Sequence, residues 1–138
     1  MKEYKRRIYY YETDRMNYVH NSNYLRLFEE ARLDYMRQTG VDYHSMEDAG
    51  IIIPVVEAHV KYGSPLRYDD EVTIRTIVTE FNGIRLKFAY EIYPNGSDKP
   101  STTGWTSHCF LDDETRHPLS IKKNMPEAYK AVIDSMQE

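Results

Sequence analysis

The spacing of apolar residues divides the chain into segments of different period. In residues 5–11 bulky and aromatic side chains follow one another, which favours an extended strand. Across residues 23–39 the apolar positions recur every three or four residues, which predicts an amphipathic helix. Residues 21–23 offer polar N-cap side chains, and Gly40 suits the C-cap. The predicted apolar stripe is Tyr24, Leu27, Phe28, Ala31 and Tyr35, widened by Leu25 and Met36, while Glu29, Glu30, Arg32, Asp34 and Arg37 fill the remaining, polar positions.

After a short helical or irregular piece at residues 43–49, the pattern becomes that of strands. Residues 51–62 predict a strand that Pro54 interrupts. Apolar and polar residues then alternate in two runs, on either side of Asn82-Gly83, which is a strong β-hairpin signal. The remaining predicted elements are a strand over residues 101–111, a short strand near 116–119 and a closing helix over 127–136 that follows Pro126.

These elements predict one long helix packed against an antiparallel sheet, which is an α+β arrangement. The 138 residues fit a single domain with its own hydrophobic core. The chain shows no internal repeat, no low-complexity segment and no linker. Residues 1–138 are therefore expected to form one domain.

The composition narrows the classes of partner. The 18 basic and 22 acidic residues give a net charge of −4, which provides no basic footprint for nucleic acid or for an anionic membrane. No segment approaches the ~20 apolar residues of a membrane span, and the first residues lack the apolar core of a secretion signal. Cys109 is the single cysteine, so no intrachain disulfide can form. We therefore expect a cytoplasmic protein that binds neither nucleic acid nor membrane.

The polar loop between the first strand and the long helix, residues 12–22, is where chemistry is expected. Asp14 in this loop would lie close to a helix N-terminus, whose free N–H groups and dipole favour developing negative charge. Acyl transfer needs such a combination of a nucleophile or general base and a donor for the carbonyl oxygen. Turn formation and helix capping also account for loops rich in Asp and Asn, so the residues alone leave both interpretations open.

The same loop and the segments after it resemble the hotdog-fold thioesterases of the 4-hydroxybenzoyl-CoA type. Thr13-Asp14 matches the family's Thr-Asp after a tyrosine-rich strand, and residues 24–32 match its helix opening Tyr-Leu-x-x-Phe-Glu-x-Ala-Arg. Residues 54–62 and 65–72 are similar to the family's next two blocks. The blocks occur in order over roughly residues 4–93. The resemblance implies a hotdog fold, in which an antiparallel sheet wraps one long central helix and two subunits pair to form sites at their interface.

The resemblance also implies a function and its residues. The chain would hydrolyse an acyl-CoA to a carboxylic acid and free CoA, without a cofactor, as a homodimer or homotetramer. Asp14 matches the catalytic carboxylate, a nucleophile or a general base toward water, and the backbone N–H at Asn21 matches the donor that polarises the thioester carbonyl. Many relatives carry histidine at the position of Asn21, whereas this chain has His20 and then Asn21, and Asn17 replaces a common glycine. The residues expected to contact the substrate are Tyr11, His20, Asn23, Tyr24 and Glu57.

Several alternatives stay open at this level. An acyl carrier protein thioesterase would use the same chemistry, and a hotdog hydratase or a non-catalytic acyl-CoA-binding module are further alternatives. The histidines show no spacing that suggests zinc, so no metal site is expected. The 13 tyrosines and Trp105 suit either an aromatic acyl group or sheet packing. The basic residues available for the CoA phosphates are Lys61, Arg67, Arg85, Lys87, Arg116, Lys122 and Lys123.

Overall fold

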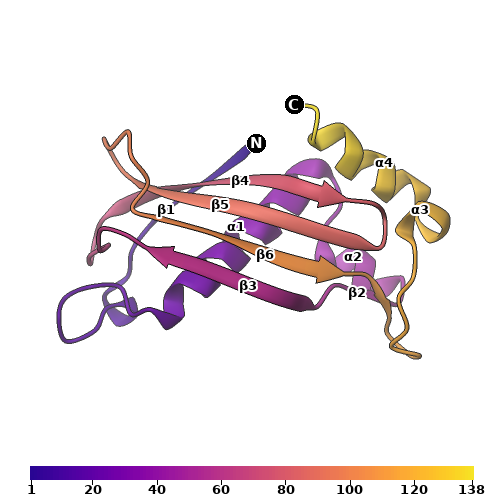
Figure 1. The fold of residues 1–138 in the computed structure, drawn as a ribbon, viewed down its shortest axis with the longest axis horizontal. Coiled ribbons are helices and arrows are strands. Elements are labelled where there is room, and N and C mark those ends of the chain that lie inside the picture. The colour runs from indigo at the N-terminus through magenta and orange to yellow at the C-terminus, as the bar shows by residue number, and fades with distance from the viewer.

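Five antiparallel strands lie over one long helix in the computed structural model, which describes residues 1–138 (Figure 1). This helix, α1 (Ser22–Thr39), crosses one face of the sheet, so the predicted α+β hotdog architecture is confirmed. A separate short pair joins β2 (Ile51–Ile52) to β7 (Leu111–Asp112). Across the main sheet the order is β1 (Lys2–Arg7), β4 (Glu71–Phe81), β5 (Arg85–Pro94), β6 (Thr102–Cys109) and β3 (Val55–Tyr62), which leaves β1 and β3 at the two edges.

The helices begin and end at residues whose chemistry suits those positions. Gly40 ends α1 in the predicted left-handed conformation, with φ 86°, and its N–H donates to the Arg37 carbonyl. Asp42 caps the next helix by accepting the Ser45 N–H at 2.8 Å. No helix is long and apolar enough to cross a membrane. The shorter elements are η1, a 3-10 turn (Tyr10–Glu12), α2 (Tyr43–Asp48), α3 (Ile121–Asn124) and α4 (Pro126–Ser135).

The core forms where the apolar face of the sheet meets the helix. Alternate residues of β4 and β5 are buried, as the period of two predicts, and the central positions of the helical stripe are buried as well. Two positions differ from the prediction. Leu25 lies beside the stripe and is 43% exposed, whereas Arg32, which was assigned to the polar positions, is only 5% exposed. Arg32 is in the core because it contacts a tyrosine hydroxyl of the sheet, Tyr90, at 3.1 Å.

Gly104 in β6 lets the helix approach the sheet closely. A Cβ atom at this position would lie 2.5 Å from Cε2 of Phe28 and 2.4 Å from the carbonyl oxygen of His59. No side chain larger than hydrogen fits between these two neighbours. The Phe28 ring therefore rests directly against the backbone of β6, which fixes the height of α1 below the sheet.

The predicted strand over residues 5–11 is wrong in its second half. The strand β1 ends at Arg7, and the tyrosines that follow form the turn η1. The Glu12 carboxylate causes this reversal, because it accepts the Tyr9 N–H at 2.7 Å and pairs with the Arg6 guanidinium. The Glu12 N–H also donates to the Tyr9 carbonyl at 3.0 Å. Bulky side chains favour a strand, but these local polar bonds outweigh that preference.

The strands near the end of the chain are shorter than predicted. The strand expected over residues 101–111 is divided between β6 and β7, and the one expected near residues 116–119 is reduced to a single bridge between Leu111 and Pro118. Proline has no N–H to continue a ladder. The hairpin at Asn82-Gly83 is confirmed: Gly83 has φ 90°, and the Asn82 side chain accepts the N–H of Arg85 at 2.7 Å.

Candidate active site

The loop that leads into α1 is held to the rest of the chain by backbone hydrogen bonds. Thr13 forms a bridge with Val19, and Tyr18 forms one with Arg67 on the far side of the loop. The Val19 N–H donates to the Leu66 carbonyl at 2.8 Å. Asn17 adopts φ 67° at the tip, a left-handed conformation that asparagine tolerates in place of glycine. The loop therefore has one defined path although it contains no helix or strand.

Asp14 is a half-buried carboxylate with no cation beside it. Its backbone N–H donates to the Tyr18 carbonyl at 2.8 Å, which fixes the main chain. One carboxylate oxygen, Oδ1, accepts the Met16 N–H at 2.9 Å. The other oxygen accepts no hydrogen bond within the chain, and the carboxylate forms no ion pair. This oxygen is free to contact a water molecule or a substrate.

The start of α1 offers a backbone donor that the chain itself does not use. Asn21 occupies the N-cap position, but its side chain makes no capping bond. Instead Nδ1 of His20 accepts the Ser22 N–H at 3.2 Å and lies 2.8 Å from the Ser22 hydroxyl. The Asn21 N–H donates to no acceptor in the chain. A free N–H at the positive end of an 18-residue helix is suited to binding a developing oxyanion.

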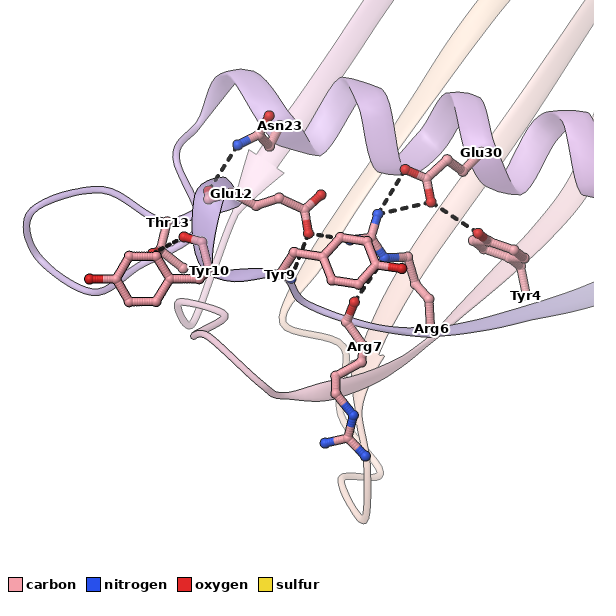
Figure 2. A network of polar contacts seen from close by, with 9 residues as sticks. All are labelled: Tyr4, Arg6, Arg7, Tyr9, Tyr10, Glu12, Thr13, Asn23 and Glu30. Atoms are coloured by element: carbon pink, nitrogen blue, oxygen red, sulfur yellow. Dashed lines mark hydrogen bonds and ion pairs between the residues drawn. The ribbon is translucent and has the colours of Figure 1, made fainter.

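A partly buried polar network anchors the turn before the loop (Figure 2). Arg6 lies between two carboxylates, those of Glu12 and Glu30, and its Nη1 is 2.7 Å from Oε2 of Glu30. The Glu30 carboxylate also accepts the Tyr4 hydroxyl at 3.0 Å. The Glu12 carbonyl accepts the Asn23 side chain at 2.8 Å, which joins η1 to the first turn of α1. Asn23, predicted to contact substrate, thus serves first as a buried anchor of the loop.

Two tyrosines meet at the start of α1. The rings of Tyr24 and Tyr62 meet edge to face at 5.2 Å, and the Tyr62 hydroxyl donates to the Asn21 carbonyl at 3.3 Å. Burial raises the pKa of Tyr24, and the negative charge of Asp14 adds to this effect. The Tyr62 side chain therefore links the Tyr24 ring to the Asn21 carbonyl, while the grouping of these residues with Asp14 in one site stays a prediction. Tyr62 was missed; the alternation of β3 places it on the same sheet face as Val60, which is the signal that would have found it.

Two further residues predicted to contact the substrate are exposed at the surface of the chain. Tyr11 is 77% exposed and stacks on Tyr9, with ring centres 5.6 Å apart. Glu57 pairs in register with Ser107 and lines a cavity of about 720 Å³ that also contains Lys87 and Trp105. The Glu57 side chain alternates with Ala58, whose register partner Thr106 is buried on the helix side, so Glu57 belongs to the outer face of the sheet. Glu57 thus lies on the opposite side of the sheet from α1, and the contact of Tyr11 with a substrate stays a prediction.

Among the basic residues considered for CoA, Arg67 lies nearest to this loop. It forms the bridge with Tyr18, and its guanidinium lies 5.3 Å from the centre of the Tyr18 ring. Arg67 is exposed and forms no ion pair with an acidic side chain. Its charge is thus available to an anionic ligand.

Comparison with known proteins identifies the family of this chain. Residues 10–133 match the family model described as the thioesterase-like superfamily. The chain is 31% identical to the DHNA-CoA thioesterase of Staphylococcus aureus, with a TM-score of 0.91 over 96% of this chain and 88% of that one. It is 32% identical over 122 residues, 88% of each chain, to YneP of Bacillus subtilis, provisionally named an acyl-CoA thioesterase. It is also 26% identical to the 1,4-dihydroxy-2-naphthoyl-CoA hydrolase of Thermosynechococcus vestitus, over all of this chain and 94% of the relative.

Proposed function

Because this chain belongs to the thioesterase-like superfamily, we propose that it hydrolyses acyl-CoA thioesters at the loop before α1, with Asp14 as the catalytic carboxylate. The observation that carries the proposal is the unpaired Asp14 carboxylate in the loop that leads to the free Asn21 N–H. A base or nucleophile and an oxyanion donor are the two parts that acyl transfer requires.

The chemistry follows from these two groups. As a general base, Asp14 takes a proton from water while the water oxygen bonds to the thioester carbon and the carbonyl electrons move to oxygen. The Asn21 N–H stabilises the resulting oxyanion. When the carbonyl re-forms, the C–S bond breaks and CoA leaves as a thiolate that takes up a proton. If Asp14 attacks directly, an anhydride forms first and water then cleaves it to the same acid.

The Asn21 donor belongs to the main chain, and two substitutions separate it from the side chain. Asn21→Ala is expected to leave kcat within about twofold, because the side chain makes no capping bond. Asn21→Pro removes the N–H at a residue whose φ of −54° proline can adopt, and kcat is expected to fall about 10²-fold. The kcat values of the two variants are compared in steady-state assays, and circular dichroism checks that the helix is intact. Equal rates for the two variants would remove the Asn21 N–H from the mechanism.

The edge strand β3 supports a paired assembly. It forms one border of the sheet, and seven of its eight residues are exposed, including Val55, Val56 and Tyr62. A long exposed edge with apolar side chains is a surface for pairing with another strand. Pairing with β3 of a second copy, antiparallel about a twofold axis, would bring the partner chain close to Tyr62 and so to the site.

Light scattering after size exclusion is expected to give at least a dimer. Ala58→Glu, on the exposed edge strand, is expected to shift the mass toward the monomer and to lower kcat/KM with it. Thr79→Glu, on the interior strand β4, introduces the same charge at another exposed position and should change neither quantity. A wild-type monomer with full activity would refute the interface site.

Release of free thiol from a panel of acyl-CoAs tests the proposed function. The panel spans short, medium, long, branched and aromatic acyl groups, because fold and loop do not define the acyl group. Arg67→Gln should raise KM for the CoA thioester more than for the same acyl group on a short pantetheine analogue, because its free cation borders the loop. No turnover of any acyl-CoA by the folded protein would exclude an acyl-CoA thioesterase and favour a carrier-bound substrate or a binding role.

A further inference from the structure

One residue, His20, supplies the acceptors for two of the N–H groups at the start of α1. The Ser22 N–H donates to Nδ1 of the His20 ring at 3.2 Å, and the Asn23 N–H donates to the His20 carbonyl at 2.9 Å. The Tyr24 N–H donates to the Asn21 carbonyl at 3.4 Å. Of the four N–H groups from Asn21 to Tyr24, only that of Asn21 therefore has no acceptor in the chain.

The His20 ring takes the place of an ordinary N-cap side chain. That role usually falls to Ser, Thr, Asp or Asn, but the Asn21 side chain makes no capping bond and its φ of −54° is already helical. Nδ1 of His20 also lies 2.8 Å from the Ser22 hydroxyl, so the ring contacts Ser22 at two atoms. Because the Ser22 N–H is thereby occupied, the helix start presents one free donor instead of two.

The main chain that carries this ring is held in place. The His20 N–H donates to the Glu12 carbonyl at 2.9 Å, and the same carbonyl accepts the Asn23 side chain at 2.8 Å. One residue earlier, the Val19 N–H donates to the Leu66 carbonyl at 2.8 Å. The ring therefore extends from a fixed backbone, and its position determines how the first turn of α1 is capped.

The cap requires the uncharged form of the ring. A backbone N–H can only donate, so Nδ1 accepts from Ser22 and carries no proton, which leaves the ring proton on Nε2. In the charged imidazolium both nitrogens are donors, so a proton on Nδ1 would point at the Ser22 N–H and at the positive end of the helix dipole. Imidazole is the side chain that gains its proton as the pH falls from about 8 to 5. The capping bond is therefore present at the upper end of this range and lost at the lower end.

No second imidazole adjoins this helix start. The Glu12 carboxylate is paired with Arg6, and the Tyr62 hydroxyl donates to the Asn21 carbonyl. The titratable and charged side chains on the segments that contact the helix start are Glu12, Asp14, Tyr18, Tyr24, Tyr62 and Arg67. None of these is a histidine, so His20 is the group here that an imidazole titration would report.

We propose that His20 is a positioning residue of the acyl-transfer site: its uncharged ring caps α1, so that the Asn21 N–H is the one donor presented to the oxyanion, and a proton on the ring removes that support. This inference rests on the proposed thioesterase function, because it assigns a regulation by pH to that same site. It differs from the substrate contact that the sequence predicts for His20. Loss of a positioning residue lowers kcat, whereas loss of a substrate contact raises KM.

Two substitutions of His20 test the proposal in assays of thiol release. His20→Ala removes the acceptor and should lower kcat about fivefold at about pH 8, with KM little changed. His20→Asn supplies a side-chain oxygen that accepts the same N–H without titrating, so it should restore most of that loss. As the pH falls from about 8 to about 5.5, the ratio of the wild-type kcat to that of His20→Asn should fall about fivefold, because only the wild type has a ring to protonate. Titration of Asp14 affects both proteins equally and cancels in this ratio.

Two further measurements keep the outcomes distinct. His44→Asn, a substitution of the same kind at an exposed position of α2, is the matched control and should keep the wild-type kcat and its pH dependence. The nitrogen chemical shifts of the His20 ring report the cap without turnover and should show the Nε2–H tautomer at about pH 8. Equal pH profiles of the wild type and His20→Asn, or a raised KM with unchanged kcat in His20→Ala, would overturn the inference while leaving the thioesterase intact. The expected tautomer with no thiol release from any acyl-CoA would instead overturn the proposed function, on which the inference rests.

Discussion

Asp14→Asn is expected to lower kcat about 10³-fold while the protein stays folded. The amide has nearly the shape of the carboxylate, and its oxygen can still accept the Met16 N–H that Oδ1 accepts in the native loop. What it lacks is the negative charge that removes a proton from water or attacks the thioester. Thiol release at saturating acyl-CoA measures kcat. The temperature of thermal unfolding shows whether the variant is folded.

A matched control separates loss of this carboxylate from loss of charge in general. Asp98→Asn removes a carboxylate from the exposed turn between β5 and β6, far along the chain from the loop. It is expected to retain native turnover and native KM. Because Asp14 forms no ion pair, its substitution should also leave thermal stability close to that of the wild type. Near-native turnover by Asp14→Asn would exclude this carboxylate from the mechanism.

Arg6→Met is expected to lower the free energy of unfolding by about 3 kcal/mol, the largest stability loss expected from one polar side chain here. Arg6 is the one cation between Glu12 and Glu30, and its side chain is only 7% exposed. Its removal leaves two carboxylates facing each other, one of them also 7% exposed. Chemical denaturation monitored by tryptophan fluorescence gives the free energy, and the rate of thiol release reports whether the loop is still held.

Two companion variants test the cause of that loss. Arg6→Met combined with Glu12→Gln removes one of the two carboxylate charges that Arg6→Met leaves unpaired. The double variant should therefore recover part of the lost stability. Arg75→Met removes an arginine of the exposed pair with Glu3, so it should destabilise the protein far less. If Arg6→Met and Arg75→Met lost equal stability, the buried network would not be what anchors η1.

The sequence predicted the elements whose burial repeats at regular intervals. The stripe from Tyr24 to Tyr35 has the period of a helix, and Gly40 marks its end because only a left-handed residue fits there. The two β-strands around Asn82-Gly83 were predicted for the same reason. The spacing of apolar residues depends only on neighbours within a few positions. The sequence therefore predicts these helices and strands without knowledge of distant contacts.

The parts that the sequence did not predict depend on particular contacts. The tyrosine run forms a turn because the Glu12 carboxylate bonds to Arg6 and to the Tyr9 N–H. The strand propensity of tyrosine predicts the opposite, so these bonds could not be found from residue type. Arg32 is buried because a hydroxyl from a distant strand meets it. Tyr62 joins the site through a bond to the Asn21 carbonyl, 41 positions earlier. Asp14 itself was identified from the resemblance, because capping and turn chemistry alone would have explained an aspartate there.

The pairing of β1 with β4 has a consequence for the order of events during synthesis. Lys2 lies opposite Thr76 and Arg7 opposite Glu71, so β1 has no partner until a ribosome has made residues 71–76. The Val19 N–H likewise lacks its acceptor, the Leu66 carbonyl, until that residue has been made. Contacts between distant residues form slowly, because a long loop must close first. The residues proposed for catalysis are thus translated before the segments that hold them in place, and a nascent chain that stops before about residue 76 cannot assemble them.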